Sequence, residues 1–169
     1  FKVSDFVGSV ERFKWALKHK ILRQVPLTGA FVQAIIKGGN LDVLKRAIKN
    51  PNRLVGHGAQ YAPGFEFIRH EEIWTAAQFG QTHIFEWFMD QPALHDKIFG
   101  WDRARLLAAH GGHLDILKVF KARADKYPDD EAWHRKWDDA RNTAFFEGNV
   151  EMFEWVIAHG TCRVDTRTF

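Results

Sequence analysis

His110 and His113 stand on either side of two glycines, and two imidazoles so close in sequence could share a zinc ion. A zinc site needs three or four ligands, and the chain supplies neither a cysteine pair nor a His-Glu-x-x-His pattern for the rest. The alternative interpretation is that His113 hydrogen-bonds a neighbouring turn of the fold. We therefore expect no bound metal.

Other short patterns that could do chemistry are also incomplete. Gly38 to Asn40 resembles a phosphate loop, but no Gly-Lys-Ser/Thr follows and no strand precedes it. Cys162 stands beside Arg163, which could activate its thiol, yet it is an unpaired cysteine. The acidic clusters at residues 71–72 and 129–131 stand where helices should begin, and the helix dipole explains them. The sequence therefore predicts neither catalysis nor a cofactor.

The elements that would position such residues must come from a chain of 169 residues, of which 46% are hydrophobic and 27% charged. This composition suits one compact domain or one short repeat array. A net charge of +3 is too small to argue for a nucleic-acid partner by itself. A single cysteine excludes an internal disulfide framework and favours a reducing compartment. No apolar run approaches the roughly 20 residues that span a bilayer, so no membrane is expected as a partner.

A glycine followed by an apolar stripe recurs five times. The segments are GSVERFKWAL, GNLDVLKRAI, GQTHIFEWFM, GHLDILKVF and GNVEMFEWVI, beginning at Gly8, Gly39, Gly80, Gly112 and Gly148. Successive glycines stand 31, 41, 32 and 36 residues apart, and an irregular period in the thirties is typical of stacked helical hairpins.

Each glycine is predicted to end one helix and to precede another. Residues four, five and eight positions after the last four glycines share one face of the following helix. They are Val43, Leu44 and Ala47; Ile84, Phe85 and Phe88; Ile116, Leu117 and Phe120; Met152, Phe153 and Val156. Small or apolar residues stand before the glycines, as at Ala76–Ala77 and Ala108–Ala109, which lets two antiparallel helices approach closely.

Tryptophans reinforce the repeat. Trp15, Trp87 and Trp155 share the seventh position after their glycines, and we interpret them as core or inter-repeat contacts. The stretch from Trp101 to Arg105 recurs from Trp137 to Arg141, with Trp, Asp, Ala and Arg in the same places. The last two repeats therefore arose by duplication.

The strings AAHGGHLDILKVF, IIKGGNLDVLKRAI, AAQFGQTHIFEWF and AFFEGNVEMFEWV resemble the ankyrin repeat. The Thr-Pro-Leu-His helix start of that family is absent here, and the Gly-Ala-Asp-Val-Asn link has only one faint echo, at residues 159–165. The resemblance implies an all-α, ankyrin-type α-solenoid of stacked helix-turn-helix repeats, and these departures predict little or no β structure. Pro128 and the acids after it predict a long inner helix that reaches Phe146.

The whole chain, residues 1–169, is predicted to be a single repeat domain. Residues 1–22 would form a partial N-terminal repeat, residues 27–50, 65–90, 101–123 and 129–160 four repeats, residues 51–64 an inserted loop and residues 161–169 a C-terminal tail. Because a repeat array needs its terminal apolar surface covered, we expect either that residues 163–169 fold back as a cap or that the natural chain continues.

The resemblance also implies a function, which is to bind another protein through the concave face of the inner helices, without catalysis. The matching candidate residues are Lys37, His70, Gln78, Phe79, Trp101, Asp102, His110, Asp138, Phe146 and Glu147, and Trp133 and Trp137 would extend this surface. The high aromatic content supports binding, because Trp and Phe are enriched at the centres of interfaces. Alternatively, Trp101 and Trp137 fill the gap left by the missing finger.

A second reading uses the basic residues of the predicted outer helices. Lys18, Lys20, Arg23, Lys45, Arg46, Lys49, Lys118, Lys121 and Arg123 could form a ridge that meets nucleic-acid phosphates. We favour the simpler account, in which these charges stabilise helix C-termini and keep the chain soluble. We thus expect a protein partner, no nucleic acid, and a monomer when unbound. Degenerate arrays of this type are familiar from protist and giant-virus proteins and from secreted pathogen effectors, which suggests an intracellular, reducing compartment, reached after secretion if the chain is such an effector.

Overall fold

The computed structural model describes residues 8–19, 21, 29–49, 68–94, 98–129, 133 and 137–160. All regular structure in these ranges is helical and they contain no strand, which confirms the all-α prediction. The predicted loop at 51–64 and tail at 161–169 lie outside them. The α-helices are α2 (Val10–Lys18), α3 (Gly29–Lys37), α4 (Leu41–Lys49), α5 (His70–Gln78), α6 (Thr82–Met89), α7 (Ile98–His110), α8 (Leu114–Lys126), α10 (Trp137–Phe146) and α11 (Val150–His159), and a short 3₁₀ helix, η4, covers Pro92–Leu94.

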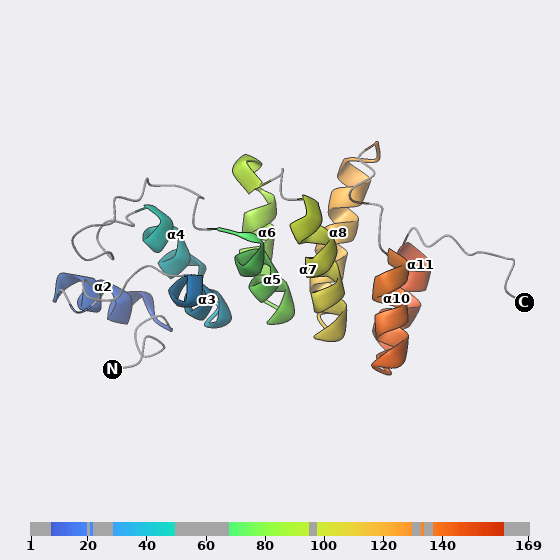
Figure 1. The fold of residues 1–169 in the computed structure, drawn as a ribbon, viewed down its shortest axis with the longest axis horizontal. Helices are drawn as coiled ribbons and strands as arrows, with labels where there is room; N and C mark the ends of the chain where they lie inside the picture. The colour runs from blue at the N-terminus through green and yellow to red at the C-terminus, as the bar shows by residue number, and fades with distance from the viewer. Residues whose placement is uncertain are drawn as a thin grey trace, which may run out of the picture.

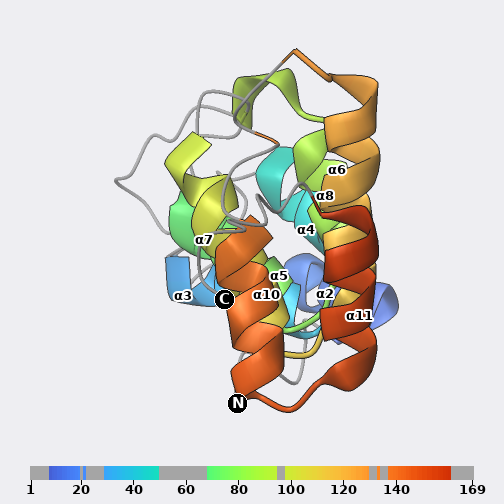
Figure 2. The same ribbon diagram turned by 90° about the vertical axis from the view of Figure 1, so that its right-hand side faces the viewer.

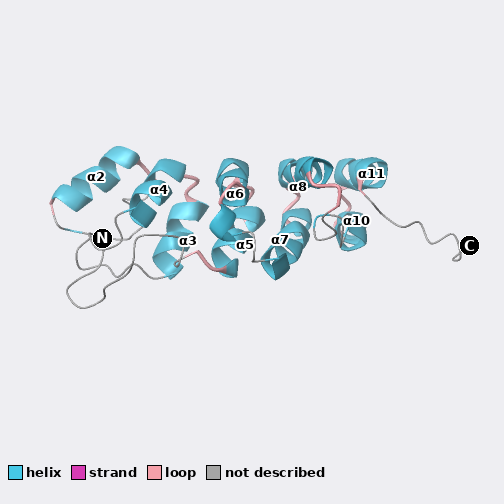
Figure 3. Ribbon diagram, turned by 90° about the horizontal axis from the view of Figure 1, so that it is seen from above, coloured by secondary structure: helices cyan, strands magenta, loops and turns pink. Residues whose placement is uncertain are grey.

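The helices form antiparallel pairs that follow one another in a row (Figure 1). The pairs are α3–α4, α5–α6, α7–α8 and α10–α11, and α2 packs on α4 ahead of them. Viewed from above, α3, α5, α7 and α10 form one layer and α2, α4, α6, α8 and α11 form the other (Figure 3). We call these the inner and the outer helices. Inner helices contact inner helices of neighbouring pairs, so the stack is continuous through the inner layer.

The repeated glycines make the turn within each pair. Gly39, Gly80, Gly112 and Gly148 have φ between 65° and 73°, the left-handed region in which only glycine is unstrained. At Gly80, the glycine N–H donates to the Ala77 carbonyl at 3.3 Å and the next N–H to the Ala76 carbonyl at 2.9 Å. The same two bonds recur at the other three turns. This is a Schellman motif, which satisfies the last carbonyls of the inner helix and reverses the chain.

The apolar stripe of the outer helices faces the inner helices. Of the twelve predicted stripe residues, all are buried except Phe153, which is half-buried. The paired alanines before the glycines are also fully buried, which confirms the close helix approach predicted from their size. These contacts place the core between the two layers.

The shared tryptophans have different surroundings. Trp87 lies under the Lys45 ammonium at 5.6 Å, a contact between neighbouring repeats, and Trp155 lies 6.2 Å from Trp137. Trp15 is 52% exposed, so the interpretation of this residue as a core contact is wrong. Its register explains the exposure: Trp87 is covered from the preceding repeat, and no helix described by the structure precedes α2.

The helices of the third full repeat span Ile98–Lys126, somewhat more than the predicted residues 101–123. In the fourth repeat α10 ends at Phe146, the predicted end of the inner helix, while residues 130–132 and 134–136 of its predicted first part lie outside the described residues. Among the other inner helices, α7 has 13 residues, whereas α3 and α5 have nine residues each.

Candidate functional site

Each inner helix exposes one face. Positions nine, six and two residues before the turn glycine are three and four residues apart, so they share a side of the helix. We call the surface they form the inner-helix face. Its residues are Ala30, Gln33 and Lys37 on α3, Glu71, Trp74 and Gln78 on α5, Arg103, Leu106 and His110 on α7, and Asp139, Asn142 and Phe146 on α10, all exposed or half-buried.

Contacts between neighbouring repeats hold side chains of this face in place. The Arg103 guanidinium lies 4.7 Å from the Trp74 ring centroid, and the Lys37 ammonium lies 4.9 Å from that of Phe79. His110 Nδ1 lies 3.0 Å from Glu147 Oε1 and pairs with it as an ion when the imidazole is protonated. Because these side chains are already held, a partner would order few of them on binding.

Six of the predicted binding residues gather where the inner helices end. Lys37, Gln78, Phe79, His110, Phe146 and Glu147 are all exposed at or just before the glycine turns. Three others lie at the opposite ends of the helices. Half-buried His70 stacks on Trp74 at 6.0 Å, and Asp102 and Asp138 pair with the arginines three residues after them.

The three predicted tryptophans of the binding surface lie in the core instead. Trp101, Trp133 and Trp137 are 3%, 7% and 1% exposed. Trp101 packs edge-on against Phe85 at 5.6 Å, and Trp133 lies 6.4 Å from Phe120. The expectation that these rings meet a partner is therefore wrong. They fill the junction between the second, third and fourth repeats, in line with the alternative interpretation of Trp101 and Trp137.

Arg105 is a buried cation that the sequence analysis did not single out. Its guanidinium lies 4.7 Å from the Phe120 ring and 4.9 Å from that of Trp137, and its Nη2 donates to the Trp133 carbonyl at 3.3 Å. The side chain is fully buried, with the Asp102 carboxylate 4.0 Å away. A guanidinium suits this place because it is weakly hydrated and stacks on aromatic faces. The duplicated Trp-Asp-x-Ala-Arg stretch contained the signal, because both copies carry the same arginine.

Trp74 and Arg103 are surface residues that the sequence analysis also missed. Both lie on the inner-helix face, where the indole is half-buried and the guanidinium covers it. A signal was available, since Trp74 and Leu106 share one position, six residues before their glycines. An apolar side chain there, on the face of the helix opposite its buried stripe, indicates a contact surface.

His110 and His113 each contact a neighbouring repeat. His113 Nε2 donates to the Gln78 carbonyl at 2.9 Å, which confirms that it hydrogen-bonds a neighbouring turn, and its ring covers Gly80. His110 points to Glu147 instead. Among the described residues, no three His, Cys, Asp or Glu side chains come together as metal ligands could. Cys162 lies outside the described residues.

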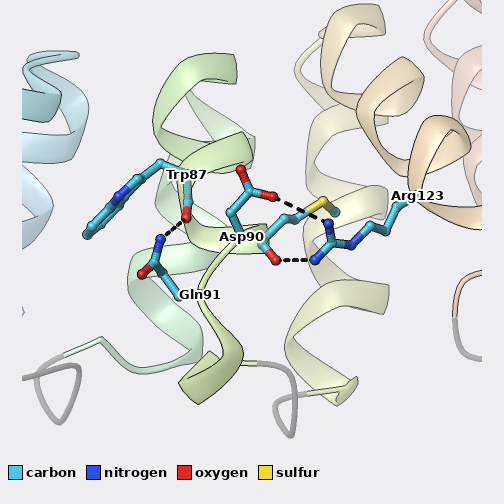
Figure 4. A network of polar contacts seen from close by, with 5 residues as sticks. Trp87, Asp90, Gln91 and Arg123 are labelled. Carbon is cyan, nitrogen blue, oxygen red and sulfur yellow. Dashed lines mark hydrogen bonds and ion pairs between the residues drawn. The ribbon is translucent and has the colours of Figure 1, made fainter. Parts of the chain in front are cut away.

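Three basic residues of the outer helix α8 pair with carboxylates. Lys118 lies 3.1 Å from Asp115, and Lys121 pairs with Asp125. Arg123 pairs with Asp90 at 3.3 Å and also donates to the Met89 carbonyl, while Gln91 donates to the Trp87 carbonyl nearby (Figure 4).

Arg123, Asp90 and Met89 line a groove of about 270 Å³ between α6 and α8. Lys20 and Arg23 lie outside the described residues. Because Lys118, Lys121 and Arg123 have carboxylates beside them, these three side chains are less available to phosphates.

The fold and its exposed inner face define an all-helical, repeat-like protein. No protein-family model, curated protein or solved structure matches the chain. In the part of the chain that the structure describes, no helix is long and apolar enough to cross a membrane.

Proposed function

We propose that this chain is a degenerate ankyrin-type repeat module that binds a partner protein through the inner-helix face and catalyses no reaction. The observation that carries the proposal is the set of exposed aromatic and charged side chains on four successive inner helices, held in place from repeat to repeat by Arg103–Trp74, Lys37–Phe79 and His110–Glu147. Such a surface is broad and already ordered, so little of the binding energy is lost in ordering it.

The aromatic side chains are the expected anchors. Trp74 is half-buried, Phe79 is 45% exposed and Phe146 is 83% exposed, so each ring has apolar area left to bury against a partner. Anchors of this kind each contribute about 2 kcal/mol or more to binding, whereas charged residues at the rim contribute little. Lys37 and the His110–Glu147 pair would then serve mainly to orient the partner.

The spacing of the anchors limits the shape of the partner. Packed helices lie about 8–10 Å apart, and α7 lies between α5 and α10 in the row. The axes of α5 and α10 are therefore separated by roughly 20 Å. A partner helix covers that distance in about 13 residues at 1.5 Å per residue. A partner segment with apolar side chains about 20 Å apart would therefore contact Phe79 and Phe146 together.

The resemblance extends the proposal to the place of action. Ankyrin-type arrays of this degenerate kind include secreted pathogen effectors that work inside host cells. A chain with one cysteine suits the reducing conditions there.

The experiment is affinity capture from candidate cell lysates with quantitative mass spectrometry, using the wild-type chain and three single variants. Trp74→Ala removes an anchor from the inner-helix face, and Phe79→Ala removes one beside it, at the end of α5. Tyr127→Ala is the matched control, because Tyr127 is a 40% exposed aromatic residue just after the outer helix α8. We expect one protein to be retained by wild type and by Tyr127→Ala, and to fall at least tenfold with the other two variants at unchanged helicity. Equal recovery by all four chains would contradict the proposal.

The nucleic-acid reading remains the second candidate, with α4 as its best remaining surface because Arg46 and Lys49 are exposed there. It predicts binding to duplex DNA or RNA that weakens steeply as salt rises. Absence of a mobility shift at low salt would remove it.

A further inference from the structure

The last described pair of helices exposes residues at positions that are buried in every earlier pair. Three residues before the turn glycine stand Ile36, Ala77 and Ala109, and each is fully buried. The equivalent residue of the last pair is Phe145, which is 64% exposed. Phe146, at the next position, corresponds to exposed residues in all four pairs. Phe145 therefore occupies a position at which the earlier repeats are covered by their neighbours.

The outer helix of this pair repeats the observation. Nine residues after the glycine, Ile48 and Met89 are buried and Lys121 is half-buried, whereas Ile157 is 53% exposed. Val150 is 65% exposed, and Phe153 lies 5.6 Å from Phe145. With Arg141, which is equivalent to buried Arg105, these residues form a largely apolar surface on α10 and α11 that we call the end face. Figure 2 views the stack from this end.

The internal copy of the same motif indicates what covers such a face. Arg105 has Asp102 three residues before it and is covered by Trp137 and the Trp133 carbonyl of the next repeat. Arg141 has Asp138 in the same place, at 3.1 Å. Its Nε and Nη2 also donate to Asn142 Oδ1 at 3.3 and 3.2 Å, so the guanidinium is held on α10, and its flat side is suited to an indole ring.

We propose that the end face binds a helical hairpin of the same repeat pattern, carried by a partner polypeptide, with a tryptophan stacked on Arg141 as Trp137 stacks on Arg105. The argument is continuity with the existing repeat-to-repeat interface of α7 and α10. A second copy of this chain is a poor source of the hairpin, because the matching side of its own α10 already packs on α7 through Trp137. The end face is distinct from the inner-helix face, so this inference does not depend on the proposed function.

The test uses a defined hairpin, a polypeptide with the sequence of residues 125–160. It is added separately to the full chain and, in a second protein, attached after Gly160 in place of residues 161–169. The attachment continues the 36-residue period between Gly112 and Gly148, and the tether compensates if the free hairpin folds poorly. Binding of the free hairpin is followed by fluorescence anisotropy, and docking of the tethered hairpin by amide hydrogen exchange in α11.

We expect the free hairpin to bind the chain, or the tethered hairpin to slow amide exchange in α11 at least tenfold. Phe145→Asp in the chain should abolish this binding or slowing. Phe146→Asp is the matched control and should leave it intact, because Lys37, Gln78 and His110 stay exposed at that position although another pair packs after theirs. A hairpin in which the residue equivalent to Trp137 is alanine should dock at least tenfold more weakly. The inference is overturned if neither form docks, or if Phe145→Asp and Phe146→Asp act alike. It is also overturned if the chain alone forms a dimer as its concentration rises and Phe145→Asp prevents that dimer. A second copy would then cover the end face.

Discussion

Replacement of Gly80 by alanine tests whether neighbouring turns are stacked as the structure has them. At φ of 65°, a Cβ on residue 80 would lie 2.6 Å from His113 Nδ1, so the imidazole must move and give up its bond to the Gln78 carbonyl. The left-handed backbone costs alanine about 1–2 kcal/mol. The lost hydrogen bond adds about 1 kcal/mol. We therefore expect Gly80→Ala to lower the free energy of unfolding by about 2–3 kcal/mol.

Gly112→Ala is the matched control within the same array. Its φ is 73°, but the nearest neighbour of its Cβ would be Asn149 Nδ2 at an ordinary 3.5 Å. This variant should lose only the backbone contribution of about 1–2 kcal/mol. Both losses are measured by urea denaturation, with hydrogen exchange to locate the change.

A double-mutant cycle isolates the ring contact. In a His113→Ala background the clash at residue 80 is absent, so Gly80→Ala should then cost no more than Gly112→Ala. If Gly80→Ala lowers the free energy of unfolding by the same amount with and without the imidazole, the ring does not cover the glycine in solution. The neighbouring turns are then not stacked as in the structure.

Three further outcomes follow from single contacts. Arg105→Ala removes a buried cation and should cost about 3 kcal/mol in urea denaturation, with Arg105→Met losing less because it keeps most of the volume. Asn149 Oδ1 accepts from the Met152 N–H at 3.0 Å, so Asn149→Ala should cost about 1 kcal/mol and speed amide exchange in the first turn of α11. The Lys14 ammonium donates to Glu11 and lowers the pKa of that carboxyl, so Lys14→Ala should raise the NMR titration midpoint of Glu11, and protonation at falling pH should remove the small stabilisation from this pair.

The repeat positions were predictable from the sequence because a chemical constraint fixes them. Only glycine adopts the left-handed turn without strain, so Gly39, Gly80, Gly112 and Gly148 stand at equivalent places even where the flanking residues differ. The apolar stripe after each glycine was predictable for a similar reason, because each outer helix must bury one face. The loop at 51–64, by contrast, lies outside the described residues, and its prediction stays a prediction.

The side chains of the proposed binding surface were harder to predict, because burial depends on the neighbouring repeat and not on the local pattern. Trp101 and Trp137 are each followed by two polar residues, which suggested exposure. They are buried because side chains of neighbouring repeats meet them: Phe85 of α6 packs against Trp101, and Arg105 of α7 lies against Trp137. Trp74 was overlooked because its neighbours Ile73 and Ala76 gave the stronger core signal.

The residue after each turn glycine shows how one sequence position serves two structural purposes. Asn40 and Asn149 are short, and each caps its own outer helix by accepting from the N–H three residues later. Gln81 and His113 are longer, and each donates to a carbonyl at the end of the inner helix of the preceding repeat. Gln81 donates to the Lys37 carbonyl, and His113 donates to the Gln78 carbonyl.

These cross-repeat bonds use backbone carbonyls only, so the side chains of Lys37 and Gln78 stay available on the inner-helix face. Substitution of Gln78 by alanine would remove its amide from that face and leave the acceptor of His113 in place. The chemistry of the surface can therefore change from repeat to repeat while the stack keeps its geometry, and this separation is what a binding module with variable contacts requires.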